Sequence, residues 1–298
     1  MAKKHLGVDE EKFKIQSGQA TMMASKSAHS TYRYLWDASF SIFSQFGEDG
    51  ILDYLCDVLD ITKPRILELG SGNFNECNSR FLAEFRSAEV VAVDARKDLV
   101  SSISKMELNW KNHIFPIQVF VTPETVNEIE ILASENMGEV NILSIDLDGN
   151  DYWIASKMAL SKTRIIVVEY NPLFGFKRAV SVFYKSDFDR TKEHYSWDYY
   201  GASIKAWQQL FSKSDFSFIG TNRQCTNAFF IKNEDVNKLG FQAPKDLSIF
   251  TNLSTRDSRD LDSNISIRSK IQRISDISNL TVVDVTSNEE LTVKQLWT

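Results

Sequence analysis

Residues 65–73 have the sequence RILELGSGN, and residues 90–94 have the sequence VVAVD. Each is a short apolar run that carries an acid at or near its end, Glu68 in the first and Asp94 in the second. Such runs predict buried strands, and the segment between them is long enough for a helix that returns the chain in parallel. The predicted strand–helix–strand unit can hold a nucleoside. The glycines of the first turn allow close approach of a ligand to the backbone, and the carboxylate at the tip of the second strand can accept hydrogen bonds from ribose hydroxyls.

The same alternation of strand and helix continues along the chain. Further strands are predicted at residues 114–121, 140–145 and 165–168. Helical segments are predicted at residues 51–59, 99–110, 152–160 and 201–211. The strand segments are almost continuously apolar, which is typical of parallel strands that are buried on both faces.

Two later apolar runs, residues 216–220 and 227–231, are separated by a short polar loop. A loop this short can join only antiparallel strands, so a terminal hairpin is predicted. The expected fold is α/β, a Rossmann-like, doubly wound sheet of seven strands, five parallel plus the terminal antiparallel hairpin. A dinucleotide dehydrogenase would instead need a second mononucleotide-binding half with six parallel strands. A nicotinamide oxidoreductase is therefore the less favoured alternative.

We expect one main domain at residues 41–240, with extensions at both ends. Residues 1–40 are polar and rich in Ser and Lys, which predicts a flexible start that passes into a helix or loop. Residues 241–298 are rich in Ser, Asn, Asp and Thr, which predicts a polar tail or a small appendage.

The composition is that of an ordinary soluble globular protein, and it excludes several functional classes. The chain has 298 residues, a net charge of −6 and a pI near 5.4, and this acidity argues against nucleic acid as a partner. The sequence has no apolar run of about 18 residues, so no membrane span is expected, and its basic start lacks the apolar stretch of a signal peptide. The three cysteines have no metal-binding spacing, which predicts reduced, buried thiols in a cytoplasmic protein.

Four of the five predicted parallel strands end in a carboxylate: Glu68, Asp94, Asp146 and Glu169. Because ligands of open α/β sheets bind at the carboxyl ends of the strands, we expect these acids to meet in one cleft. Clustered like charges cost free energy unless a cation or a hydroxyl-rich ligand uses them.

The motif DLDGND at residues 146–151 adds further acids at that edge. Asp146 and Asp148 are candidates for a general base, and the motif could also ligate a divalent cation. In the alternative interpretation, Asp148 or Asn150 caps the following helix. Asp146, Glu169 and Asn171 form a candidate oxygen-ligand set for Mg²⁺, which could lower the pKa of a substrate hydroxyl.

A long aromatic connection, residues 172–200, follows the last predicted parallel strand. It can form either a satellite core or the lid of a binding pocket, and in the second case it would suit a sugar or another polyhydroxylated acceptor. His194 in this connection is a candidate catalytic base.

At these motifs the chain resembles class I S-adenosylmethionine-dependent methyltransferases, whose seven-stranded sheet also ends in a hairpin. The block IDLDG at residues 145–149, followed by residues 165–171, is similar to the FkbM-type methyltransferases. SQFGEDGI at 44–51, YYGAS at 199–203 and NAFF at 227–230 resemble an uncharacterised bacterial branch of that family. The resemblance covers roughly residues 40–235.

The resemblance implies specific site residues. Glu68, Gly70 and Gly72 would surround the methionine part of the cofactor, with Asp94 on the ribose and Asp146 near the transferred methyl group. The full set of expected cofactor contacts is Glu68, Gly70, Ser71, Gly72, Asn73, Asp94, Ala95 and Asp146. The sequence departs from the family pattern where Asn73 and its neighbours replace a third glycine.

The expected function is an S-adenosylmethionine-dependent methyltransferase that acts on an oxygen acceptor such as a sugar or glycan hydroxyl, with Mg²⁺ as a candidate second cofactor. The polar ends of the chain, which could dock onto other proteins, motivate a different alternative. In that alternative, the chain is a non-catalytic nucleoside- or S-adenosylmethionine-binding partner in a glycan-assembly complex.

Overall fold

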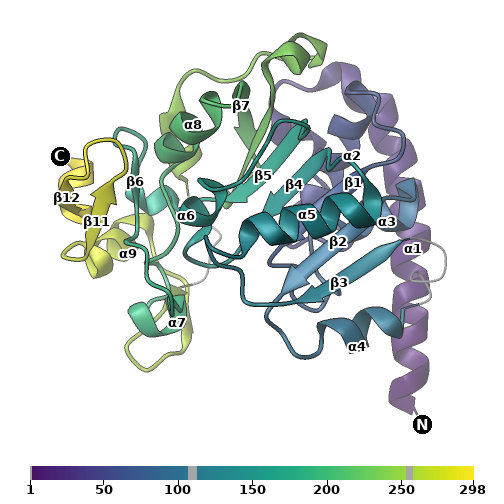
Figure 1. Ribbon diagram of the computed structural model, residues 1–298, viewed down its shortest axis with the longest axis horizontal. Coiled ribbons are helices and arrows are strands. Elements are labelled where there is room, and N and C mark those ends of the chain that lie inside the picture. The colour runs from purple at the N-terminus through teal and green to yellow at the C-terminus, as the bar shows by residue number, and fades with distance from the viewer. Residues whose placement is uncertain (1, 107–112, 253–257) are drawn as a thin grey trace.

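The computed structural model describes residues 2–106, 113–252 and 258–298, with the backbone alone described for residues 2–10. A seven-stranded sheet lies at its centre, in the order β3-β2-β1-β4-β5-β8-β7 (Figure 1). Its strands are β1 (Arg65–Leu69), β2 (Glu89–Asp94), β3 (Ile114–Gln118), β4 (Ile142–Ile145), β5 (Ile165–Glu169), β7 (Phe216–Thr221) and β8 (Asn227–Lys232). β1 to β5 pair in parallel, whereas β8 runs antiparallel to both β5 and β7. The prediction of a mixed α/β fold with a mostly parallel sheet is confirmed.

Helices cover both faces of this sheet (Figure 1). One face packs against α5 (Val126–Met137), α6 (Asp151–Ala155) and α8 (Ile204–Ser212). The other face packs against α2 (Glu48–Val58), α3 (Arg80–Arg86) and α4 (Leu99–Ser104). Neighbouring residues in β1 show why both layers form, because Ile66 and Leu67 point to opposite faces and both are buried.

Two helices are shorter than expected. The helix predicted at 99–110 ends at Ser104, and residues 107–112 lie outside the described residues. The helix predicted at 152–160 spans Asp151–Ala155. The second half of this predicted helix was inferred from apolar residues that include Leu160. In the structure Leu160 lies beyond the end of α6 and packs in the core on one face of the sheet.

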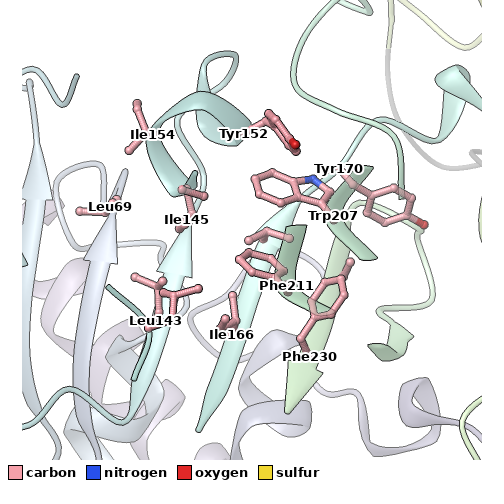
Figure 2. Close-up of a cluster of buried hydrophobic side chains, with 14 of the residues drawn as sticks. Leu69, Leu143, Ile145, Tyr152, Ile154, Ile166, Tyr170, Trp207, Phe211 and Phe230 are labelled. Carbon is pink, nitrogen blue, oxygen red and sulfur yellow. The ribbon is translucent and has the colours of Figure 1, made fainter. Parts of the chain in front are cut away.

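An aromatic cluster fills the core beneath β5 and β8. Figure 2 shows Trp207 and Phe211 from α8 close to Phe230 from β8. The indole and the Phe211 ring are stacked, with their centroids 5.3 Å apart. The Trp207 Nε1–H donates to the carbonyl oxygen of Glu169 at 3.1 Å, which satisfies the buried indole and ties this core to the tip of β5.

The N-terminal extension is helical from Ala2 onward, so the predicted passage into a helix is confirmed, and the helix begins earlier than expected. α1 spans Ala2–Ala28 and lies along α2 and α3 (Figure 1). Good helix formers such as Ala, Lys, Gln and Met fill it. Part of one side contacts the domain, where Gly18 lies against the Phe85 ring and Met22 packs on the core. These contacts supply the packing that composition alone does not reveal.

The C-terminal region forms a small ordered unit on the opposite side of the molecule (Figure 1). β11 (Thr281–Asp284) pairs with β12 (Glu290–Thr292) and with β6 (Val180–Ser181), a strand of the aromatic connection. The remaining short elements are η1 (His29–Thr31), η2 (Leu35–Ala38), η4 (Pro172–Phe174), α7 (Arg190–Glu193), η5 (Asn233–Lys238), η6 (Leu247–Thr251), β9 (Ser258–Arg259), β10 (Ile265–Ser266), α9 (Lys270–Ile277) and η7 (Val293–Trp297). Among the described helices, none is both long enough and apolar enough to cross a membrane.

A buried ion pair joins this unit to the aromatic connection. Arg273 of α9 and Asp198 are 0% and 1% exposed, and the Arg273 Nε lies 3.1 Å from the Asp198 Oδ2. Ser258 Oγ donates to the same carboxylate at 2.9 Å. Leu173, Phe174 and Tyr199 of the connection share a core with α9, β11 and β12, so part of the connection is a satellite core.

Candidate functional site

Three adjoining cavities open at the carboxyl ends of the parallel strands. Their volumes are about 190, 650 and 90 Å³, and we call them the base-side, acceptor-side and inner cavities. Asp146 lines all three, and Gly70 lines the base-side and inner cavities. The strand-tip residues predicted from the sequence therefore meet in one cleft, at the edge where open α/β sheets bind ligands.

The glycine turn after β1 is built as a close-contact loop. Gly70 has a φ of +90°, and a Cβ there would lie 1.7 Å from the Asp146 carbonyl oxygen. Gly72 has a φ of +60°, but a Cβ there would meet nothing within 4 Å. Gly70 is therefore required by the backbone of the neighbouring strand, whereas Gly72 borders open space.

Asp94 at the tip of β2 holds that turn. Its Oδ2 accepts from the Gly72 N–H and its Oδ1 from the Arg96 N–H, both at 2.8 Å. Each carboxylate oxygen has a second lone pair, so the group can still accept from a ligand hydroxyl. Ala95, the next residue, lines the base-side cavity.

The other two turn residues, Ser71 and Asn73, hydrogen-bond to groups close to the turn. Ser71 is fully buried, and its N–H donates to the Val93 carbonyl at 3.1 Å. The Asn73 side chain accepts from the Asn75 N–H at 3.2 Å and lies 3.4 Å from Asp98. Asn73 thus shapes the turn where the family pattern has a third glycine.

Glu68 organises the loop that follows the turn. Its carboxylate is 2% exposed and accepts from the Asn78 N–H at 2.7 Å, the Ser79 N–H at 3.1 Å and the Ser79 hydroxyl. Burial raises the pKa of Glu68, while the hydrogen bonds from Ser79 and Asn78 oppose that rise. Glu68 also lines the inner cavity, so it both supports the loop and faces the cleft.

The 146–151 motif differs from the predicted helix cap. Asn150 occupies the N-cap position of α6 without a side-chain cap bond, and its amide donates to the Lys185 carbonyl at 2.8 Å. Asp151 folds back instead, accepting from Leu147 N at 2.7 Å and Gly149 N at 2.8 Å. Burial, and then the charge of Glu169, raise the pKa of Asp151 to about 7.

Asp146, Asp148 and Glu169 form the strand-tip acid cluster. Each offers a carboxylate oxygen, and these three atoms lie within 4.8 Å of one another. Asp148 has a φ of +57° and a 61% exposed side chain, whereas Glu169 is buried. The cluster brings together Asp146 and Glu169, which the sequence placed in one metal site, and adds Asp148.

Arg190 of α7 lies against this cluster. Its guanidinium pairs with Asp148 and has its Nη1 3.6 Å from the Glu169 Oε1. It also covers the Tyr200 ring at 3.9 Å and donates to the Trp197 carbonyl from Nε at 3.2 Å and from Nη2 at 2.9 Å. The cluster therefore already has a cationic partner, which lowers the repulsion among its carboxylates. No sequence spacing linked Arg190 to the strand tips.

Asn171 does not fit its predicted role as a metal ligand. Its Nδ2 donates to the carbonyls of Asp198 at 2.9 Å and Tyr200 at 3.0 Å, and its Oδ1 accepts from the Leu173 N–H at 3.0 Å. These bonds use the amide to cap η4 and hold the aromatic connection. The position of Asn171 after a strand tip suggested a ligand, but Asn171 is the N-cap residue of η4, and its side chain bonds backbone groups instead.

His194 does not fit its predicted role as a base. Within the described residues, it lines none of the three cavities. Its Nδ1 lies 2.8 Å from the Ser196 Oγ, and burial lowers its pKa. Neighbours of His194 along the connection, Arg190 and Trp197, line the acceptor-side cavity instead.

The loop before α2 forms the opposite wall of the cleft. Gln45 and Phe46 line the inner and acceptor-side cavities. Asp49 holds the loop, because its Oδ2 accepts from the N–H groups of Ile42, Phe43 and Ser44 at 2.6, 2.7 and 3.0 Å. Burial raises the pKa of Asp49 to about 7 despite these bonds.

Glu48 and Asn227 complete the inner cavity, and no role was predicted for either residue from the sequence. The Glu48 carboxylate accepts from Asn222 Nδ2 at 2.6 Å, Asn227 Nδ2 at 2.8 Å and Phe46 N at 2.9 Å. Asn222 and Asn227 lie 174 and 179 positions after Glu48 in the chain. The sequence pointed to Glu48 and Asn227 in one respect, since residues 44–51 and 227–230, which contain them, carried part of the family resemblance.

Comparison with known proteins adds no relative. A scan against protein-family models and a search of curated protein sequences both found no match to this chain.

Proposed function

We propose that this protein is an S-adenosylmethionine-dependent methyltransferase of the class I type, related to the FkbM-type enzymes, that acts on a sugar or glycan hydroxyl. The observation that carries the proposal is the glycine turn after β1, closed onto Asp94 and bordered by open space at Gly72. The pairing of β8 with both β5 and β7 supports it, since the resembled family ends its sheet in a hairpin. In the part of the chain that the structure describes, no second set of parallel strands follows β5, as a dinucleotide fold would require.

A cofactor in this cleft would have its ribose on Asp94, where the carboxylate retains free lone pairs. Its adenine would occupy the base-side cavity, beside Ala95, Phe120 and Val121. The sulfonium would then lie near Asp146, which lines every part of the cleft.

The acceptor-side cavity has the size and lining for a sugar. Its volume is about 650 Å³, and the rings of Phe188 and Trp197 line it together with polar side chains. Aromatic faces with converging polar groups suit a polyhydroxylated ring. The cavity meets the proposed cofactor site at Asp146 and Asp148.

The proposed reaction is an in-line displacement. The acceptor oxygen attacks the methyl carbon, the carbon–sulfur bond breaks with its electron pair on sulfur, and S-adenosylhomocysteine leaves. Asp146 would orient the hydroxyl, and Asp148, the more exposed acid, would take its proton. Positioning by the cleft supplies most of the acceleration.

Mg²⁺ would have to share the strand-tip acid cluster with Arg190. The three carboxylates are a suitable oxygen set for the ion. However, the guanidinium pairs with Asp148 and lies near Glu169, so it would need to move before a divalent ion could bind. The proposed reaction therefore relies on the side chains of the cleft rather than on a metal.

The test is calorimetric titration with S-adenosylhomocysteine. We expect the unmodified protein to bind it and Asp94→Ala to lose most of the affinity, while Asp98→Ala, an exposed neighbour, retains it. Failure of the unmodified protein to bind would refute the proposal.

A non-catalytic S-adenosylmethionine-binding partner in a glycan-assembly complex is the second candidate. The pairing of Asp148 with Arg190 favours it, because the guanidinium occupies the carboxylate that the enzyme would need as its base. Incubation with methyl-labelled cofactor and cell-extract fractions separates the two. Labelled product that is lost in Asp146→Ala supports the enzyme, and cofactor binding with no labelling of any fraction supports the partner.

A further inference from the structure

The acceptor-side cavity is lined by a cation that comes from outside the main domain. Arg259 of β9 belongs to the C-terminal region, yet it lines this cavity together with Asp146 and Asp148 at the strand tips. Its guanidinium carbon lies 4.2 Å from the centre of the Trp197 ring, so the side chain is held over an aromatic face. The family resemblance ends near residue 235 and implies no role for Arg259.

A buried network fixes the position of Arg259. Ser258, the preceding residue, is fully buried, and its hydroxyl donates to Asp198, which also pairs with Arg273 of α9. The Arg259 N–H donates to the Ser196 carbonyl at 3.2 Å. These bonds tie β9 to the aromatic connection, so the Arg259 side chain is placed in the cavity wall before any ligand binds. Such preorganisation lowers the entropy cost of binding.

The acids that line this cavity already have cations beside them. The strand-tip acid cluster lies against Arg190, and Asp189 pairs with Lys192 at 2.8 Å. By contrast, no carboxylate in the part of the chain that the structure describes pairs with the Arg259 guanidinium. A guanidinium in a ligand cavity suits a phosphate or a carboxylate of the ligand, because both groups present two oxygens to its N–H groups.

We infer that the acceptor carries an anionic group, a phosphate or a carboxylate attached to its sugar, and that Arg259 binds this group. The inference rests on the proposed function, since it takes the acceptor-side cavity as the site of the acceptor. The cavity volume of about 650 Å³ is in the range for drug-sized ligands, which leaves room for a charged group beside one sugar ring. With its reacting hydroxyl at Asp146 and Asp148 and its anion on Arg259, the sugar would be held at two positions, which favours a productive orientation.

The test measures the binding of matched sugars by ligand-observed NMR titration, with S-adenosylhomocysteine present. The gluco, galacto and manno series each supply a neutral methyl glycoside, the uronic acid and the sugar 1-phosphate. In at least one series we expect a charged sugar to bind about tenfold more tightly than the methyl glycoside, and this preference should shrink as salt is added. A preference for the 1-phosphate identifies a sugar phosphate or nucleotide sugar as the acceptor, and a preference for the uronic acid identifies a sugar acid.

Variants of Arg259 show whether this side chain causes the preference. Arg259→Gln removes the charge and should abolish the preference, while the binding of methyl glycosides and of S-adenosylhomocysteine stays unchanged. Arg259→Lys keeps the charge but loses the planar fork, so it should retain part of the preference. The matched control is Arg223→Gln, because Arg223 is 65% exposed and does not line the cavity; this variant should leave the binding of every ligand unchanged.

The outcomes separate this inference from the proposed function. If S-adenosylhomocysteine binds but the charged sugars bind no more tightly than the neutral ones, or no sugar of any series binds, the inference is overturned and the proposed function stands. A preference that survives in Arg259→Gln assigns the anion to another group and also overturns the inference. Failure of S-adenosylhomocysteine to bind refutes the proposed function, and this inference with it. If Arg259→Gln does not fold, the sugar series on the unmodified protein and on Arg259→Lys still decides.

Discussion

Replacing Gly70 or Gly72 by alanine separates the two uses of glycine in the turn after β1. Both residues have positive φ, so a methyl group at either position introduces backbone strain of about 1–2 kcal/mol. The two sites differ in their surroundings. The added Cβ of Gly70→Ala would lie 1.7 Å from the Asp146 carbonyl oxygen, and Cβ atoms in proteins essentially never approach another heavy atom to within 3.0 Å. Because this oxygen belongs to the backbone, it cannot move aside as a flexible side chain would. Overpacking of this kind costs about 1–3 kcal/mol more.

We therefore expect Gly70→Ala to lower the free energy of unfolding by about 2–5 kcal/mol and Gly72→Ala by about 1–2 kcal/mol. Urea unfolding followed by circular dichroism measures both, provided that the slope with denaturant is unchanged. Calorimetry with S-adenosylhomocysteine should show a second difference between the two positions, in the affinity for the proposed cofactor. A methyl group on Gly72 would meet nothing within 4 Å in the structure, but it would lie beside Asp94, the proposed ribose partner, which accepts from the Gly72 N–H. If the cofactor lies over this turn, the free energy of cofactor binding should fall by more than the free energy of unfolding. Equal destabilisation by the two variants would refute the assignment of Gly70 to a backbone contact and Gly72 to open space.

Three further predictions concern buried charges. Arg273→Met leaves the Asp198 carboxylate buried without its partner, and we expect the free energy of unfolding in urea to fall by about 3–5 kcal/mol. The control, Arg268→Met, breaks a more exposed ion pair in the same region and should lower the free energy of unfolding by under about 1 kcal/mol. Similar losses in the two variants would contradict the role of burial. Because the folded-state pKa of Asp151 is about 7 and its ordinary value is 3.8, the folded state binds this proton more tightly, and the free energy of unfolding should fall as pH rises from about 4 to about 7. Asp151→Asn should reduce that slope by up to about 1.4 kcal/mol per pH unit, and an unchanged slope would show that Asp151 does not titrate there. Arg190→Ala removes the guanidinium from the strand-tip acid cluster and leaves its carboxylates available to a divalent ion. Mg²⁺ or Mn²⁺ should therefore raise the melting temperature of this variant but not of the unmodified protein. A rise in both proteins would mean that the guanidinium does not exclude the ion.

The sheet and the strand-tip positions follow from local features of the sequence. Continuous apolar runs of four to six residues mark parallel strands because burial on both faces leaves no room for polar alternation. Parallel strands place their carboxyl ends on one edge of the sheet, so the sequence alone predicts that Glu68, Asp94, Asp146 and Glu169 lie in one cleft. The glycine turn was visible for a similar reason, since positive φ at Gly70 requires glycine.

The roles of individual polar groups were decided by long-range packing. Asn171 follows a strand tip, as a metal ligand would, yet its side-chain amide donates to the backbone carbonyls of Asp198 and Tyr200, 27 and 29 residues further along the chain. Arg190 reaches the acid cluster from a connection whose course no periodicity predicts, and it takes the place beside those acids that the sequence suggested for His194.

The inner cavity depends most on tertiary structure. Glu48 and Asn227 come from opposite ends of the main domain, and neither lies in a motif whose spacing reports the other. The N-terminal helix and the C-terminal strands also depend on long-range contacts, because each is stabilised by packing its apolar face against the rest of the chain. The sequence by itself determined the sheet, the glycine turn and the acidic edge through local burial and backbone geometry. Only the tertiary structure decided which acids are paired and with which cations, because those properties belong to pairs of residues that the fold alone brings together.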